Sequence, residues 1–214
     1  TSLPFIYPAK YIFSPNPKYS ACALSSSIIP PFPAITNLTS LYPFKILYSV
    51  EARKKIRVVL EDMQPDVVHI NNFNFQLTPS ILYEIRAYEK KTKRKVKIVY
   101  TAHDSQLVCP NHLMQQYLTG ETCTKCIGGD SIHCAKNKCI HGSFVKSILG
   151  TIENKLYKWL KAYDMIDTII CPSEFLKDKL DKDSILRKKT VVLHNFVDKA
   201  EMEAGKKEKK YALY

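Results

Sequence analysis

The chain has 214 residues, of which 45% are hydrophobic and 24% charged, a composition typical of one globular domain and not of a disordered or fibrous protein. Its 32 lysines and arginines stand against 20 acidic residues, and the net charge of +12 favours anionic partners such as nucleic acid, lipid headgroups or diphosphates without choosing among them. No apolar run approaches the ~18–20 residues that cross a bilayer, so the sequence predicts no membrane span.

The first predicted elements are an amphipathic helix over residues 42–63 and a short strand after it. Apolar side chains recur in the helix at roughly helical spacing, with charged side chains between them. These apolar residues are Ile46, Val50, Ile56, Leu60 and Met63. Beyond Pro65 the run 67–70 is mainly apolar and β-branched, which predicts a strand covered on both faces.

A second helix and a second strand follow. Thr78 and Pro79 predict an N-cap and a first helical residue, and the helix that they open ends in the basic run 90–95. Residues 96–101 repeat the strand pattern. After a long irregular stretch, residues 143–163 repeat the helical one. Its apolar positions are Phe144, Ile148, Ile152, Leu156, Trp159 and Leu160.

The last predicted units are strands at 166–171 and 190–193, with a short helix between them that Ser173 caps. Alternating strands and helices predict a parallel sheet, because a tight turn cannot join parallel neighbours. The predicted fold class is α/β, a Rossmann-like parallel sheet with helices on both faces. Residues 1–198 form this domain, while the Lys- and Glu-rich run 199–210 is typical of a linker and 211–214 of the start of another domain.

Polar side chains stand at four predicted strand ends. These ends read His69-Ile70-Asn71-Asn72, His103-Asp104, Cys171-Pro172-Ser173-Glu174 and His194-Asn195-Phe196-Val197-Asp198. Ligands of open parallel sheets bind beyond the carboxyl ends of the strands. Histidine exchanges a proton or binds a hydroxyl near neutral pH, and Asn and Ser bind hydroxyls without charge. One such residue alone more often only closes a loop, but four strand ends in register favour sugar recognition.

An ordered set of motifs over residues 41–198 resembles the N-terminal domain of family 4 glycosyltransferases. The motifs are Pro65-Asp66-Val67-Val68-His69, Thr101-Ala102-His103-Asp104 with Cys109-Pro110, Cys171-Pro172-Ser173-Glu174-Phe175-Leu176, and Val192-Leu193-His194-Asn195-Phe196-Val197-Asp198. The resemblance implies one half of a GT-B fold, two Rossmann-like domains that face each other across a cleft. Family members open with a strand and a glycine-rich turn, and this chain has no glycine before Gly120. We therefore expect the first strand to be missing and the domain to be truncated at both ends.

The resemblance also assigns roles to the strand-end residues. It implies a transferase that takes a sugar from a nucleotide-sugar donor and passes it to a lipid-linked or saccharide acceptor, without a catalytic metal and without turnover by this piece alone. The catalytic residue would be His103, beside the transferred sugar. The residues that bind the acceptor would be His69, Asn71, Asn72 and Asp104. The residues that shape the cleft near the hinge would be Ser173, Glu174 and Asn195.

Residues 105–142 form a cysteine-bearing insert. It resembles one in a bacterial subgroup that builds surface polysaccharides. Four thiolates could close a tetrahedral, structural zinc site, although their spacing matches a zinc ribbon only in part. They are Cys123, Cys126, Cys134 and Cys139. Reduced thiols or local disulfides are the alternatives.

Two further features of the sequence bear on the compartment of the protein and on membrane contact. The first ten residues show no initiator Met, basic start or cleavage site, and the seven cysteines are an odd number, so we expect a cytoplasmic protein. The helix over 143–163 carries four lysines beside its apolar residues, a pattern compatible with peripheral contact with an anionic membrane. The ordinary interpretation, a helix that packs its apolar stripe on the core, is favoured at this stage.

Two other function classes fit the composition. A zinc-stapled nucleic-acid-binding module would use the +12 charge and the cysteines, but the lysines are scattered and no aromatic residues are interleaved with a basic run, so nucleic acid is not the expected partner. A non-catalytic carbohydrate-binding domain is the other, since an acceptor-side half alone could bind without reacting.

Overall fold

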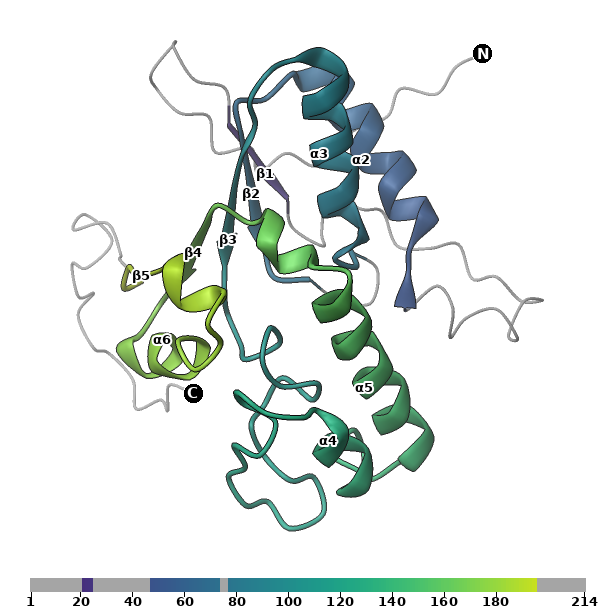
Figure 1. Ribbon diagram of the computed structural model, residues 1–214, viewed down its shortest axis with the longest axis vertical. Coiled ribbons are helices and arrows are strands. Elements are labelled where there is room, and N and C mark those ends of the chain that lie inside the picture. Colours follow the sequence, from purple (N-terminus) through teal and green to yellow (C-terminus); the bar gives the residue numbers. More distant parts are fainter. Residues whose placement is uncertain (1–20, 25–46, 74–76, 196–214) are drawn as a thin grey trace, which may run out of the picture.

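The computed structural model describes residues 21–24, 47–73 and 77–195. Five parallel strands form one sheet in the order β1-β2-β3-β4-β5 (Figure 1). The strands are β1 (Ala21–Leu24), β2 (Val67–Asn71), β3 (Lys97–Thr101), β4 (Thr168–Cys171) and β5 (Thr190–Val192). The helices are α2 (Val50–Met63), α3 (Ser80–Thr92), α4 (Ile132–Lys136), α5 (Phe144–Trp159) and α6 (Glu174–Leu180), with short 3-10 turns η3 (Ala162–Met165) and η4 (Leu186–Lys188). This alternation confirms the predicted Rossmann-like α/β class.

The register of the strands brings their carboxyl ends to one edge of the sheet. Asn71 of β2 lies opposite Thr101 of β3, and Thr101 lies opposite Ile170 of β4. Cys171, the last residue of β4, lies opposite Val192 of β5. The loops that follow β2, β3, β4 and β5 therefore leave the sheet side by side, which is the condition for a shared site.

The sheet begins one strand earlier than the sequence analysis expected. No strand was predicted before residue 67, but β1 pairs in parallel with β2 from Ala21 to Leu24. Its sequence, Ala-Cys-Ala-Leu, has no β-branched or aromatic residue, so side-chain preference did not mark it as a strand. No glycine-rich turn follows β1, so the absence of the family's opening strand stays a prediction.

Helix α2 begins later than predicted and buries a different row of residues. Ser49 caps it, because its Oγ accepts a hydrogen bond from the Ala52 N–H (3.1 Å). The buried row is Ala52, Ile56 and Leu60, whereas Val50, expected in the core, is 56% exposed. Residues 42–46 of the predicted helix lie outside the described residues. These three residues follow one another at intervals of four, so they lie on one face of the helix, and that face is the buried one.

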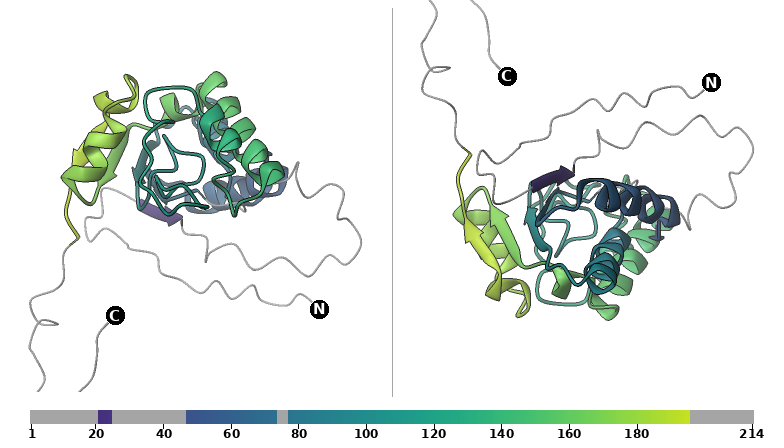
Figure 2. Two further views of the ribbon diagram at one scale, coloured as in Figure 1. Left: turned by 90° about the horizontal axis from the view of Figure 1, so that it is seen from below. Right: turned by 90° about the horizontal axis from the view of Figure 1, so that it is seen from above.

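The start of α3 also differs from the prediction. Thr78 does not cap the helix, and Pro79 occupies the cap position without a side-chain hydrogen bond. The Thr78 hydroxyl instead accepts a hydrogen bond from the Ser49 N–H (3.1 Å) and lies 2.8 Å from the Ser80 hydroxyl. Thr78 thereby joins the first turns of α2 and α3, which pack against each other on one side of the sheet (Figures 1 and 2).

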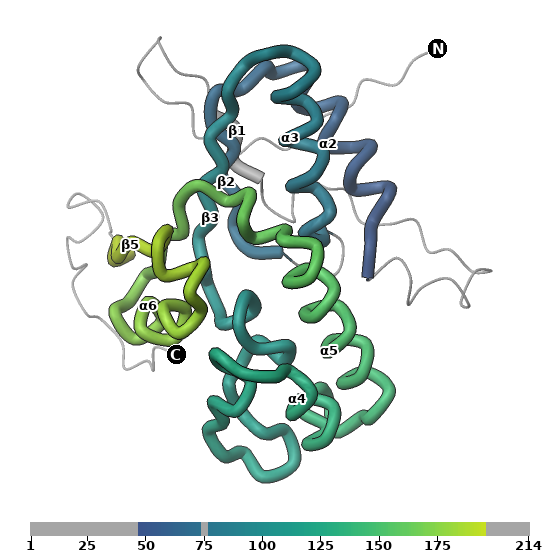
Figure 3. The backbone as a smooth tube through the Cα atoms, viewed as in Figure 1, coloured from purple at the N-terminus to yellow at the C-terminus, as the bar shows by residue number. Residues whose placement is uncertain are grey.

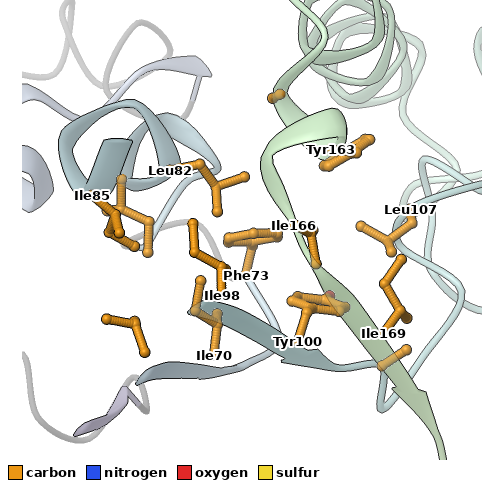
Figure 4. Packing of buried hydrophobic residues seen from close by; sticks show 14 of the residues in the cluster. Ile70, Phe73, Leu82, Ile85, Ile98, Tyr100, Leu107, Tyr163, Ile166 and Ile169 are labelled. Atoms are coloured by element: carbon orange, nitrogen blue, oxygen red, sulfur yellow. The ribbon is translucent and has the colours of Figure 1, made fainter. Parts of the chain in front are cut away.

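The core lies between the sheet and this layer of helices (Figure 4). At its centre Phe73 stacks on Tyr100 of β3, with 5.0 Å between ring centroids, and Tyr163 lies 6.5 Å from Phe73. Strand β2 was predicted to be covered on both faces, and this is wrong: Val68 and Ile70 are fully buried, while the residues that alternate with them are half-buried. The half-covered face is the one that carries His69.

Helix α5 does not bury the whole face that was predicted. The buried residues are Ser147, Thr151, Asn154 and Tyr157, and the apolar positions Phe144, Ile152 and Trp159 are exposed. The preferred interpretation, a helix whose apolar stripe packs on the core, therefore holds only in part: the other three predicted positions, Ile148, Leu156 and Leu160, are half-buried. No helix in the described ranges combines the length and apolar character that a membrane crossing needs.

A buried ion pair fixes α3 against α2. Glu84 of α3 is 3% exposed and accepts hydrogen bonds from Arg53 (2.8 Å to Oε2) and Arg57 (2.6 Å to Oε1) of α2. The bond from Arg57 lowers the pKa of Glu84, and the bond from Arg53 adds to this, although burial alone would raise it. The carboxylate is thus held charged inside the helix layer.

Replacing this carboxylate should destabilise the fold. Glu84→Gln removes the charge and one of the two acceptor oxygens, so that an amide NH2 faces one guanidinium group. This is expected to lower the free energy of unfolding by about 1–3 kcal/mol in urea denaturation at pH 7. Because the pKa of Glu84 is lowered on folding, the difference from wild type should be complete above pH 4.5 and shrink as the pH falls below it. Glu61→Gln, which removes an exposed pair with Lys91, is the control and should change little.

Equal stability of the Glu84→Gln and Glu61→Gln variants at pH 7 would contradict this account of how the two helices are held together.

Candidate functional site

Asn72 joins the ends of β2 and β3. Its Nδ2 donates to Asp104 Oδ2 (2.8 Å), and its Oδ1 accepts from the Tyr100 hydroxyl (2.7 Å) and from the His103 N–H (3.3 Å). The backbone of Asn72 is left-handed, with φ +60°, a conformation that asparagine tolerates better than most residues. One side chain therefore holds the loop after β3 in place beside β2, and it sets the backbone from which His103 projects.

Asp104 is the second centre of this group. Its Oδ1 accepts from the Gln106 N–H (2.8 Å), and its Oδ2 lies 3.6 Å from His112 Nδ1. Burial by itself would raise the pKa of Asp104, but the interactions with His112, with the Gln106 N–H and with Asn72 outweigh it and lower the pKa. Asp104 is therefore a carboxylate at neutral pH, with both oxygens engaged.

The two predicted histidines lie at the same edge. His69 Nε2 is 2.7 Å from the Thr101 hydroxyl, across the β2–β3 pairing. Burial lowers the pKa of His69, and the charge of nearby His103 lowers it further, so the His69 ring is neutral at pH 7. His103 is exposed. The edge thus offers a neutral imidazole that binds a hydroxyl and, next to it, a second imidazole that solvent and ligands can reach.

The ends of β4 and β5 carry the remaining predicted residues. Ser173 is the N-cap of α6, and its Oγ accepts from the Leu176 N–H (3.3 Å). Glu174 and Asn195 are exposed, and His194 Nδ1 lies 3.0 Å from the Pro172 carbonyl oxygen. Within the described ranges no hydrogen bond or ion pair links these residues to the Asn72 group. The structure thus brings His69, Asn72, His103 and Asp104 together, with Asn71 half-buried at the end of β2, and leaves the β4 and β5 residues as a separate part of the same edge.

Sequence reasoning missed three members of this group. Tyr100 is fully buried in β3 and was read only as part of a strand, although its hydroxyl is what places the Asn72 amide. Thr101 was read only as the start of the turn. His112 lies eight residues beyond Asp104 in an irregular segment, and nothing in the local sequence pattern places it back against that carboxylate.

The insert after β3 contains a pocket of its own. The chain leaves the sheet, loops through the insert and returns along α5 (Figure 3). The pocket is lined by Cys109, Cys123, Cys126, Cys134 and Cys139, together with Asn111, Gln115 and His133. The sequence analysis had named four of these cysteines, and the structure adds Cys109. All five are free thiols.

The donor atoms of this pocket have the chemistry of a zinc site, because several sulfur atoms face one space. The side chains are not placed as ligands of one ion, however. In the described part of the chain, no three Cys, His, Asp or Glu side chains are arranged to hold a metal ion. Burial raises the pKa of Cys126 and of Cys134 to about 12, as expected for neutral thiols. A structural zinc therefore stays a prediction, and metal analysis of the purified protein tests it.

The Asn72 amide should be sensitive to charge. Asn72→Asp keeps an acceptor for Tyr100 and His103 and tolerates the left-handed backbone, but it replaces the donor to Asp104 with a second carboxylate. The free energy of unfolding at pH 7 is expected to fall by about 1–3 kcal/mol. Two adjacent carboxylates raise the pKa of one of them, so the loss should shrink as the pH falls towards 4.

Urea denaturation of wild type and Asn72→Asp at pH 7 and pH 4.5 measures this effect. A variant as stable as wild type at pH 7, or one whose deficit grows on acidification, would show that the amide does not hold Asp104 in the folded protein.

Comparison with known proteins agrees with the geometry. The family model described as Glycosyltransferase Family 4 matches residues 12–201, which include all five strands, the insert and every residue of the Asn72 group. No curated protein and no solved structure matches the chain. The matched range, the parallel sheet and the strand-end histidines lead to one conclusion: this chain belongs to glycosyltransferase family 4.

Proposed function

We propose that the chain supplies the acceptor-side domain of an enzyme that transfers a sugar from a nucleotide-sugar donor to a hydroxyl of a lipid-linked or saccharide acceptor in polysaccharide biosynthesis. The family membership gives the general reaction, glycosyl transfer. The observation that carries the proposal for the site is the hydrogen-bonded group of Asn72, His103 and Asp104 at one edge of the sheet, with His69 bound to Thr101 at the same edge.

In this proposal the exposed His103 ring contacts the transferred sugar or the attacking hydroxyl. Its backbone N–H is bound by Asn72, and the next residue, Asp104, is bound by the same side chain. The position of the ring is therefore set by the fold before a ligand arrives, which lowers the entropic cost of orienting the reacting groups.

His69 and Asn71 would bind the acceptor. A neutral His69 ring both donates and accepts hydrogen bonds, which suits hydroxyl groups better than an imidazolium does. Asn72 and Asp104 were expected to bind the acceptor directly, but their polar atoms are already paired with protein groups. We assign them instead to holding His103 and the loop after β3. Ser173, Glu174 and Asn195 would border the donor.

The reaction proposed needs no metal, and the diphosphate of the donor fits a chain with a net charge of +12. The donor implied by the family resemblance is a nucleotide sugar. We place the reaction in the cytoplasm.

Removal of the His103 ring tests the proposal. In an enzyme that contains this domain, His103→Ala is expected to lower the transfer rate to a water-soluble saccharide acceptor about 10–100-fold, the effect of losing one or two hydrogen bonds to the reacting sugar. Because the ring is exposed, thermal unfolding should be unchanged. His103→Gln, which restores a hydrogen-bonding side chain, should recover part of the rate if the ring acts by hydrogen bonding.

Wild-type turnover by His103→Ala would contradict the assignment, and so would a variant whose lost activity is matched by a lost fold.

A further inference from the structure

The exposed face of α5 carries four large apolar side chains. Phe144 is 52% exposed, Val145 67%, Ile152 47% and Trp159 78%. We call these four residues the α5 stripe. They are spaced at i, i+1, i+8 and i+15, so that they line one side of a sixteen-residue helix. Single exposed apolar residues are ordinary on a protein surface, but an aligned set that includes tryptophan is not.

The buried face of α5 explains why its apolar residues point outward. The first half of that face, with Ser147 and Thr151, packs against the insert, whose backbone needs hydrogen-bond partners, while Tyr157 lies in the main core. Ser147 Oγ accepts from the Ile140 N–H (2.9 Å), and Thr151 Oγ1 donates to the Ser131 carbonyl oxygen (3.3 Å). Since a loop-rich insert selects polar residues on the face that touches it, the apolar residues of the helix lie on the other side.

The stripe continues onto the insert. Tyr117 is 57% exposed and Leu118 67% exposed, and both side chains lie against Gly142, two residues before Phe144. Any side chain at Gly142 would approach the Leu118 and Tyr117 side chains to within 3.3–3.4 Å, and its backbone has φ +67°, so glycine permits this close contact. Tyr117 and Leu118 thereby extend the apolar surface beyond the N-terminal end of α5.

Lysines are frequent in the segment that carries this surface. Residues 136–161 contain six lysines and a single acidic residue, Glu153. The exposed lysines are Lys136, Lys138, Lys146, Lys155 and Lys161, and Lys158 is half-buried. Glu153 is half-buried, and burial raises its pKa to about 7. Lys155 is paired with Asp130 (2.9 Å), and the other exposed lysines of this segment have no acidic partner within it. An apolar stripe that lies among lysines is complementary to a layer of acyl chains beneath anionic headgroups.

We propose that the α5 stripe, with Tyr117 and Leu118, docks this protein on an anionic lipid bilayer. The helix would lie in the plane of the interface, with Trp159 and Phe144 among the headgroups and the lysines on lipid phosphates. No part of the described chain crosses the bilayer in this arrangement.

The location of the stripe connects the docking to the proposed transfer reaction, on which this part of the inference rests. The insert follows the carboxyl end of β3, and α5 runs back from the insert along the outer side of the molecule (Figure 1). Docking would therefore hold the strand-end site at a fixed height above the bilayer. An acceptor anchored in the lipid would reach His103 without leaving the membrane.

Trp159 is the single tryptophan of the chain and reports on this surface directly. In the free protein its emission should be that of an exposed indole and acrylamide should quench it readily. Vesicles of phosphatidylcholine with phosphatidylglycerol should shift the emission to the blue and protect it from acrylamide, while vesicles of phosphatidylcholine alone should do so far less. Co-sedimentation with the same vesicles gives the partition coefficient.

Two kinds of variant separate the apolar and the electrostatic contributions. Ile152→Ser should lower the partition coefficient about fivefold. Lys146→Gln and Lys161→Gln should each lower it about fivefold, with no further loss on neutral vesicles. Val58→Ser is the matched control, because Val58 is 59% exposed on α2, outside the stripe, and it should bind vesicles like wild type.

The proposal is overturned if anionic vesicles leave Trp159 emission unchanged, or if Ile152→Ser and Val58→Ser partition alike. It is also overturned if Trp159 of the free protein already has blue-shifted emission and is protected from acrylamide, because another segment of the chain then covers the stripe. The same change on raising the protein concentration without lipid also overturns it, because a second copy then covers the stripe. Transfer to a water-soluble acceptor is measured separately, in an enzyme that contains this domain. Lipid binding without transfer by that enzyme removes the proposed function, and transfer without lipid binding removes only the docking.

Discussion

The carboxamide of Asn72 is the contact on which the site depends. Parallel pairing of β2 with β3 brings two loops to one edge, but pairing alone does not fix how the loops lie. Asn72 does so, because one amide binds the Tyr100 hydroxyl, the His103 N–H and the Asp104 carboxylate at once. A group with both a donor and an acceptor in one plane is required, and the left-handed backbone at this position further restricts the residue.

The second constraint is the insert between β3 and α5. Its own buried cluster consists of three cysteines with Ile140 packed against them, which is a small core for a segment of this length. The insert is therefore supported by α5: Ser147 Oγ accepts from the Ile140 N–H, and Thr151 Oγ1 donates to the Ser131 carbonyl oxygen. That demand makes the inner face of α5 polar and leaves the apolar residues outside. An exposed apolar surface on α5 thus arises from the same packing that supports the insert after β3.

The sequence predicted the parts of the fold that rest on local pattern. The strands from β2 onward and the helices between them follow from β-branched runs and helical spacing, and the capping role of Ser173 follows from its position before Glu174. β1 could not be found, because Ala-Cys-Ala-Leu acquires its structure from pairing with β2 rather than from its own residues. The burial of α5 was predicted only in part for a related reason: periodicity shows that a helix has two faces, but the element that packs on it decides which one is buried.

The site shows the same division. His69 and His103 were predicted from their places at strand ends, and the structure sets both at the shared edge. Tyr100 and His112 could not be assigned, since their roles depend on contacts across 28 and 8 residues that no spacing rule specifies. Asn72 and Asp104 were named for ligand binding, whereas their hydrogen bonds are made within the protein.

The central claim is that the ends of β2 and β3 form one sugar-binding edge, and the histidine side chains report on it most directly. The chain has six histidines, two of which, His69 and His103, belong to that edge, while His133 and His141 lie in the insert. In an NMR titration with a nucleotide sugar and a saccharide acceptor, the ring signals of His69 and His103 should shift together and saturate at the same concentrations, and those of His133 and His141 should stay in place. Shifts confined to His133 and His141, or none at His69 and His103, would contradict the account.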